Sequence, residues 1–195
     1  MTVSAKICGI TDIASMESAV LHGAAFVGLV FYSPSPRYVE LELARRLFSI
    51  VPENVKKVGL FVDPDDNLLA QTLAHVPVDL LQLHGDESPE RCSEIRRNHD
   101  VSIMKAIKVA NTYDIEKAST YNDSIDWLMF DAKAPKSLKN ALPGGNNVSF
   151  DWSLLAGRSL SVPWMLAGGL NTENVSPALG TLSKPNICTG SEGNA

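Results

Sequence analysis

The stretch from residue 25 to residue 62 decides the fold of this chain and reads AFVGLVFYSPSPRYVELELARRLFSIVPENVKKVGLFV. The runs at its two ends are short, apolar and rich in β-branched and aromatic residues, which predicts two buried strands. Leu43, Leu47 and Ile50 lie between them at helical spacing and predict one apolar helical face. A strand, a helix and a second strand in this order are typical of a parallel pair.

The same alternation continues over most of the chain. We predict eight strands, at Val3–Cys8, Ala25–Phe31, Val58–Val62, Val78–Leu83, Ser102–Ile107, Trp127–Asp131, Pro163–Ala167 and Asn186–Thr189. Eight parallel strands with intervening helices are typical of a closed (β/α)8 barrel of the TIM type, so the predicted fold class is α/β. No segment reads as a linker, and we expect a single domain over residues 1–195.

The composition of the 195 residues excludes several classes of protein. There are 17 Lys and Arg against 22 Asp and Glu, and the net charge of −5 argues against a nucleic-acid partner. No apolar run reaches the roughly 18 residues of a membrane-spanning helix, so we expect a cytoplasmic protein with no membrane partner. The 3 cysteines are far apart, which favours reduced thiols. Neither they nor the 4 histidines have the spacing of metal ligands, so no metal is predicted.

Two residues at predicted strand ends are candidates for acid–base chemistry. Cys8 ends the first strand, and Lys6 shares its inward face, where the lysine charge would favour a thiolate. Asp131 ends an apolar strand, and in a partly desolvated pocket the pKa of its carboxyl could rise, so that it acts as a general acid. The alternatives are a structural buried Cys8 and an Asp131 that caps a loop or helix.

Two further side chains are candidates for substrate contact. Arg37 lies in a proline-restricted loop, and its guanidinium suits a planar carboxylate, although a surface salt bridge would also explain it. His84 follows a strand and precedes Gly85, a position that suits substrate contact as well as a structural role. The loop Lys133–Asn147 is long and rich in Gly, Pro and Asn, so we expect a mobile segment beside the site.

Two glycine-containing turns follow the last two predicted strands. Gly168 and Gly169 follow the seventh strand, and Thr189 and Gly190 lie at the end of the eighth. Small residues there expose backbone N–H groups to an anion, and this is a common phosphate position in (β/α)8 barrels. We therefore predict that these four residues bind phosphate, although tight turns alone have a similar composition.

Several motifs of the chain, in their order, resemble those of the phosphoribosylanthranilate isomerase family. They are Lys6–Thr11 (KICGIT), Ser35–Val39 (SPRYV), Gln82–Glu87 (QLHGDE), Asp131, Leu142–Gly145 (LPGG), Phe150–Trp152 (FDW), Ala167–Leu170 (AGGL) and Glu173–Val175 (ENV). The resemblance extends over nearly the whole chain.

This resemblance implies an Amadori rearrangement of N-(5-phosphoribosyl)anthranilate in tryptophan biosynthesis, with a small phosphosugar as substrate and no cofactor. Carried onto matching positions, the family mechanism makes Asp131 the acid that protonates the ribose ring oxygen and Cys8 the base that removes the proton from C2. Arg37 would bind the anthranilate carboxylate, and the two glycine turns would hold the phosphate.

The sequence departs from the family pattern mainly near its end. Asn186 stands where Asp is usual, Cys188 where a small hydroxyl residue is usual, and Asn147 where the Gly-Gly loop often has another glycine. The chain stops at Ala195, so we expect a barrel without the final helix that ordinarily covers strand eight. A truncated, non-catalytic barrel that retains phosphate binding is therefore the alternative to an isomerase, and another phosphosugar barrel enzyme is a third interpretation. The oligomeric state is not predicted.

Overall fold

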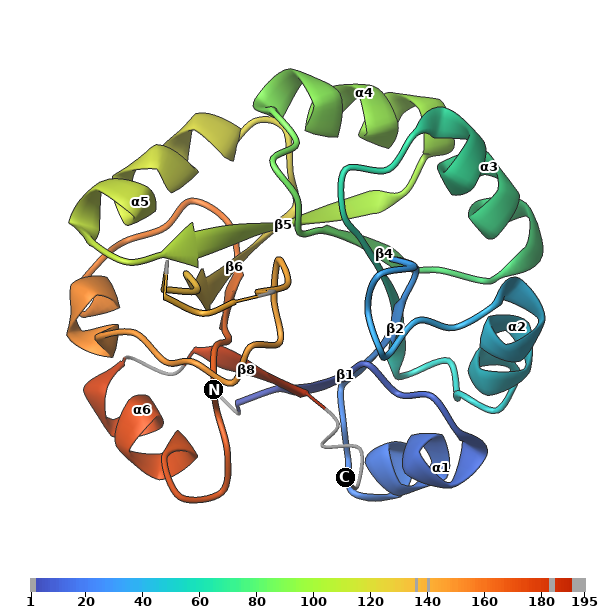
Figure 1. The fold of residues 1–195 in the computed structure, drawn as a ribbon, viewed down its shortest axis with the longest axis horizontal. Helices are drawn as coiled ribbons and strands as arrows, with labels where there is room; N and C mark the ends of the chain where they lie inside the picture. Colours follow the sequence, from blue (N-terminus) through green and yellow to red (C-terminus); the bar gives the residue numbers. More distant parts are fainter. Residues whose placement is uncertain (1–2, 136, 140, 183–184, 191–195) are drawn as a thin grey trace.

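The fold is a closed barrel of eight parallel strands, seen along its axis in Figure 1. This computed structural model describes residues 3–135, 137–139, 141–182 and 185–190. Each strand pairs with its neighbours in chain order, and β8 pairs with β1 to close the ring. The strands are β1 (Ala5–Cys8), β2 (Phe26–Val30), β3 (Lys56–Phe61), β4 (Leu80–Leu83), β5 (Ser102–Val109), β6 (Trp127–Ala132), β7 (Trp164–Leu166) and β8 (Asn186–Gly190). All the predicted strands are confirmed, with ends that differ by a residue or two.

The helices lie outside the ring of strands (Figure 1). They are α1 (Ile13–Leu21), α2 (Leu41–Ser49), α3 (Asp66–His75), α4 (Pro89–His99), α5 (Thr112–Lys117) and α6 (Val175–Thr181), with the 3-10 helices η1 (Ala118–Tyr121) and η2 (Trp152–Leu155). The predicted face of α2 is partly wrong, because the helix ends at Ser49 and Ile50 is 40% exposed. Ala44, Leu47 and Phe48 are its buried residues.

Two apolar layers hold the barrel together. One fills the interior and includes Phe26, Val58, Met104 and Met165, while the other lies between the strands and the surrounding helices. Every residue of β2 is buried, as expected for a strand with side chains in both layers. Polar side chains inside the barrel are therefore surrounded mainly by apolar residues.

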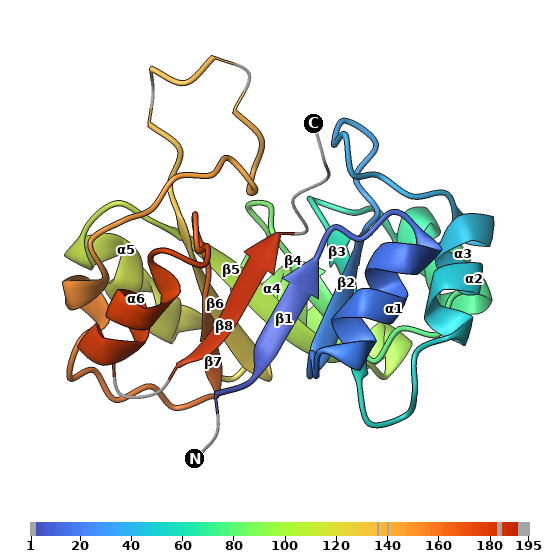
Figure 2. The same ribbon diagram turned by 90° about the horizontal axis from the view of Figure 1, so that it is seen from below.

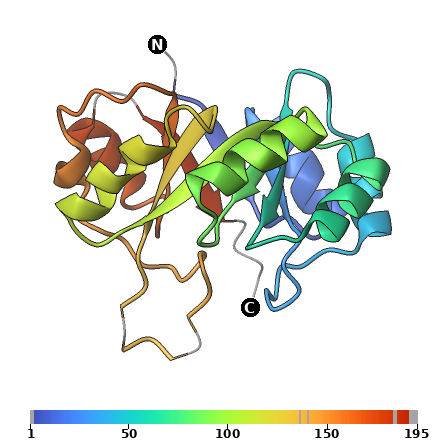
Figure 3. The same cartoon turned by 90° about the horizontal axis from the view of Figure 1, so that it is seen from above.

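The loops that follow β2 and β6 extend on the same side of the barrel, and the chain enters β1 from the other side (Figures 2 and 3). Between β6 and β7 the described residues form only the 3-10 helix η2 in place of an α-helix. The described part of the chain ends at Gly190, the last residue of β8. No helix in the described ranges has the length and apolar character needed to cross a membrane.

Candidate active site

The carboxyl ends of the strands surround a cavity of about 620 Å³. Every predicted site residue lines it, namely Cys8, Arg37, His84, Asp131, Gly168, Gly169, Thr189 and Gly190. These residues come from distant parts of the sequence, and closure of the barrel brings them to one place. The turn predicted at the end of the eighth strand continues into Ser191 and Glu192, which lie outside the described residues.

Cys8 ends β1 and lies in the barrel interior, where it is 7% exposed. Lys6 is fully buried, and its Nζ donates a hydrogen bond to Cys188 Sγ at 3.6 Å. A hydrogen bond from Cys188 lowers the pKa of the Cys8 thiol well below its ordinary value. Burial opposes this shift, while the positive charges of Lys6 and Arg37 reinforce it. The environment therefore favours a thiolate at Cys8, as expected for a base.

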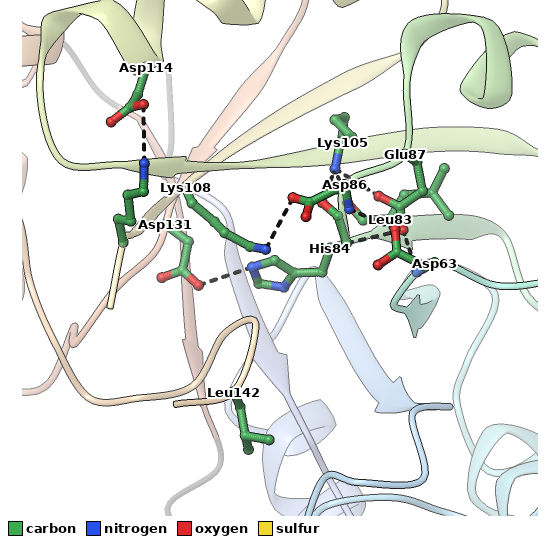
Figure 4. A network of polar contacts seen from close by, with 12 residues as sticks. Asp63, Leu83, His84, Asp86, Glu87, Lys105, Lys108, Asp114, Asp131 and Leu142 are labelled. Carbon is green, nitrogen blue, oxygen red and sulfur yellow. Dashed lines mark hydrogen bonds and ion pairs between the residues drawn. The ribbon is translucent and has the colours of Figure 1, made fainter. Parts of the chain in front are cut away.

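Asp131 lies on β6, and its carboxyl faces the imidazole of His84 (Figure 4). Its Oδ1 accepts a hydrogen bond from the amide N–H of Ala132 at 2.9 Å, and its Oδ2 lies 3.2 Å from His84 Nε2. The latter contact is short but is not aligned as a hydrogen bond, so Nε2 has no hydrogen-bond partner among the described residues. Both side chains are buried, and a ligand in the cavity can reach a carboxyl and an imidazole together.

A polar network that includes Lys105 and Glu87 lies around the loop that follows His84 (Figure 4). Gln82 Nε2 lies 3.2 Å from His84 Nδ1, a partner that the sequence reasoning missed. Gln82 precedes His84 by two positions, so the period of a strand was a signal that could have found it. Lys105 on β5 contacts the loop after β4. Its Nζ donates a hydrogen bond to the carbonyl of Gly85 at 2.9 Å and forms a buried ion pair with Glu87 at 2.8 Å.

The Arg37 side chain lies close to the backbone of Gly9 and Gly190. A Cβ atom added at Gly9 would lie 2.7 Å from Arg37 Cδ, and one added at Gly190 would lie 2.9 Å from Nη1. No carboxylate within the described ranges forms an ion pair with Arg37, so these ranges do not contain the salt bridge considered as an alternative. The guanidinium is therefore placed to meet an anionic group in the cavity.

The two predicted phosphate turns are joined to each other. Gly168 and Gly169 have φ angles of 91° and 59°, in the left-handed region that favours glycine. Thr189 Oγ1 donates a hydrogen bond to the carbonyl of Leu170 at 2.9 Å, which connects β8 to the turn after β7. This arrangement places small residues with accessible backbone on one wall of the cavity.

The loop after β6 reaches over the cavity. Gly144 lies against His84 and Asp131, and Gly145 lies against Arg37, where a Cβ atom would clash with these side chains. Asn147, which stands where another glycine was expected, has a φ of 52°. Asparagine is one of the few residues that adopt this conformation readily, so the departure from the family pattern is compatible with the loop. Mobility of this loop stays a prediction.

The fold and this cavity define a (β/α)8-barrel enzyme with a thiol, a carboxyl, an imidazole and a guanidinium around one cavity. The described residues contain no group of three or more His, Cys, Asp and Glu that could hold a metal ion. The family model described as "N-(5'phosphoribosyl)anthranilate (PRA) isomerase" matches residues 5–188. The chain therefore belongs to the N-(5'-phosphoribosyl)anthranilate isomerase family, which confirms the resemblance seen in its motifs.

Relatives of known sequence and structure agree with this assignment. An N-(5'-phosphoribosyl)anthranilate isomerase of Rhodospirillum centenum is 53% identical over 179 residues, which are 92% of this chain and 83% of that protein. One of Parvibaculum lavamentivorans is 50% identical over the same shares of the two chains. The crystal structure of phosphoribosyl anthranilate isomerase from Thermotoga maritima has a TM-score of 0.84 and 33% identity, and the match covers 97% of this chain and 88% of that one.

Proposed function

We propose that this chain is an isomerase that converts N-(5-phosphoribosyl)anthranilate to 1-(2-carboxyphenylamino)-1-deoxyribulose 5-phosphate. The reaction is an Amadori rearrangement in tryptophan biosynthesis. The observation that carries the proposal is the meeting of Cys8 from β1 and Asp131 from β6 in one cavity. It is supported by a structural relative in complex with reduced 1-(o-carboxyphenylamino)-1-deoxyribulose 5-phosphate, which has a TM-score of 0.82 and 32% identity, with 97% of this chain and 88% of that one covered.

The reaction needs one group that gives a proton and one that takes a proton. Protonated Asp131 gives its proton to the ribose ring oxygen as the bond from that oxygen to C1 breaks, and the nitrogen lone pair forms an iminium. The Cys8 thiolate then takes the proton from C2, the electrons of that C–H bond form the C1–C2 double bond of an enolamine, and the π electrons of the iminium return to nitrogen. The enolamine becomes the ketone when its hydroxyl loses a proton and C1 gains one. Exchange with solvent restores both side chains to their starting states.

Three further groups are proposed to hold the substrate. Arg37 binds the anthranilate carboxylate, because a guanidinium can form two parallel hydrogen bonds with it. The turns at Gly168–Gly169 and Thr189–Gly190 bind the phosphate through backbone N–H groups. His84 lies beside Asp131 and has an unpartnered Nε2 in the described part of the chain, so we propose that it contacts the ribose.

The remaining features of the protein are also proposals. We propose that residues 1–195 act as one domain, that the partner is the small-molecule phosphosugar, and that the protein works in the cytoplasm. The cytoplasm is where amino-acid biosynthesis is expected, and the free thiols of the chain suit a reducing compartment.

The test is an assay of freshly prepared N-(5-phosphoribosyl)anthranilate with the parent chain, Cys8→Ala and Asp131→Asn. Each variant removes one proton-transfer group, so we expect kcat to fall by about 10² to 10⁴-fold in both. Cys92→Ala is the matched control, because Cys92 is buried on α4 and does not line the cavity. It should retain the parent rate.

Two outcomes would contradict the proposal in different ways. If both variants convert the substrate as fast as the parent, the assignment of acid and base is wrong. If the parent binds the phosphosugar without converting it, the chain is a non-catalytic barrel that retains its ligand site.

A further inference from the structure

Three ionisable groups meet inside the barrel below the cavity. Lys6 and Cys8 are on β1 and Cys188 is on β8, and the register pairs Lys6 with Cys188 and Cys8 with Gly190. Lys6 is fully buried, and the two cysteines are each 7% exposed. Because alternate residues of a strand share one face, the pairing places both thiols and the ammonium on the interior side of the β1–β8 seam.

Lys6 contacts one of the two thiols directly and lies close to the other. Lys6 Nζ donates a hydrogen bond to Cys188 Sγ at 3.6 Å. A Cβ atom added at Gly28 of the neighbouring strand β2 would lie 3.0 Å from Cys8 Sγ and 3.0 Å from Lys6 Nζ, so both groups approach the same point. Gly28 leaves the space that this packing needs.

The buried ammonium of Lys6 needs a negative counter-charge from within the cluster. The surrounding interior is apolar and includes Phe26, Met104 and Met165. No carboxylate in the described ranges forms an ion pair with Lys6, and a buried ammonium without a counter-charge is costly. Burial lowers the pKa of Lys6, but its interactions with Cys188 and Cys8 outweigh burial, so that the pKa is raised.

The groups around the two thiols decide which one loses its proton. Cys8 faces Lys6 on its own strand, Cys188 on β8 and Arg37 from the loop after β2. Cys188 faces Cys8, Lys6 and the carboxyl of Asp131 from β6. The hydrogen bond to Cys8, together with burial, raises the pKa of Cys188 well above its ordinary value. These directions favour a negative charge on Cys8 and a proton on Cys188.

We propose that Cys188 is a positioning residue for the Cys8 base, accepting a hydrogen bond from the Lys6 ammonium and donating one to the Cys8 thiolate. The chain of contacts holds Cys8 Sγ at the floor of the cavity in the form that can remove a proton. The link to catalysis rests on the proposed isomerase function, whereas the thiolate itself does not. Cys188 stands where the family usually has a hydroxyl residue, which can also donate a hydrogen bond.

The experiment measures the rate at which iodoacetamide alkylates each cysteine between pH 5 and pH 9, with peptide mass spectrometry to identify the site. The variants are Cys188→Ser, which keeps a donor, Cys188→Ala and Cys188→Val, which remove it, and Lys6→Met, which removes the charge. Far-UV circular dichroism establishes that each variant is folded, and Cys188→Val fills the space of the thiol should the alanine variant fail to fold. The matched control is Cys92→Ala, since burial raises the pKa of Cys92 to about 11 and keeps it unreactive in this range.

We expect the pH midpoint of Cys8 alkylation to be unchanged in Cys188→Ser and Cys92→Ala. It should rise by at least about one unit in Cys188→Ala or Cys188→Val, which means about tenfold less thiolate well below the midpoint, and further in Lys6→Met. An unchanged midpoint in the folded donor-free variants would overturn the proposal, as would alkylation of Cys188 before Cys8 in the parent.

The same variants separate this proposal from the proposed function. If the chain isomerises the substrate, the acid limb of its kcat/KM profile should move with the alkylation midpoint and be restored in Cys188→Ser. Alkylation that follows the expected order in a chain without turnover would refute the isomerase function and leave the role of Cys188 intact.

Discussion

Gly168 shows how a single residue without a side chain serves the candidate site. Its φ is 91°, and a Cβ atom there would lie 2.7 Å from the amide nitrogen of Ala132 and 3.1 Å from Asp131 Oδ1. Backbone strain and steric pressure on the proposed acid therefore coincide at this position.

We expect Gly168→Ala to destabilise the fold by about 1–3 kcal/mol and also to lower kcat, because it displaces the carboxyl of Asp131. Two controls separate these effects. Gly23→Ala, at a φ of 81° with nothing within 4 Å of the added Cβ, should cost stability but leave kcat unchanged. Gly180→Ala lies in α6 with equally open surroundings, and it should lower neither the stability nor kcat. Urea unfolding and the isomerase assay provide the measurements, and a Gly168→Ala enzyme with full kcat would contradict the expectation.

At the scale of elements, a buried ion pair joins β5 to the loop after β4. Lys105 on β5 contacts Glu87 at 2.8 Å, and Glu87 also accepts hydrogen bonds from the amides of Asp63 at 2.8 Å and Gly85 at 3.1 Å. The sequence predicted His84 at the end of this strand but did not predict the network, because its members belong to different strands and loops.

Lys105→Met should destabilise the protein by about 3–5 kcal/mol, because it leaves the Glu87 charge buried without a partner. The matched control is Arg45→Met on α2, which breaks an exposed pair with Glu42 and should leave the unfolding midpoint nearly unchanged. Thermal unfolding of the two variants beside the parent checks this. Equal shifts in both would mean that the Lys105–Glu87 pair contributes no more than a surface contact.

For the whole molecule, closure of the ring depends on the pairing of β8 with β1. The amide N–H of Ile187 donates to the carbonyl of Ser4 at 3.0 Å, and the ladder continues to Cys8 and Gly190. This seam also brings Lys6 and Cys188 together. Because each strand of a closed barrel pairs on both sides, a break at the seam should weaken the entire structure.

We expect Ile187→Pro, which removes the amide donor, to lower the free energy of unfolding by about 1–3 kcal/mol. The conservative Ile187→Val keeps that donor and should change it far less. Far-UV circular dichroism and the fluorescence of the 3 tryptophans, which lie on β6, η2 and β7, should report the same urea midpoint in each variant. Separate midpoints for the two signals would show that the seam unfolds apart from the rest of the barrel.

The sequence by itself determined the order of the strands, the residues at their carboxyl ends and the family of the protein. These properties depend on local spacing, since the alternation of a strand decides which side chains face inward and where each strand stops. It placed Cys8, His84 and Asp131 at strand ends, and the family resemblance added Arg37 to the same site, without any knowledge of their contacts.

The tertiary structure alone decided which groups surround the two thiols, which partners His84 has and how Arg37 lies beside glycine backbone. Lys6 and Cys188 are 182 positions apart in the chain, but Lys6 Nζ lies 3.6 Å from Cys188 Sγ. The protonation state of each group depends on such short distances and on the loss of water around it. Both arise only when the barrel closes.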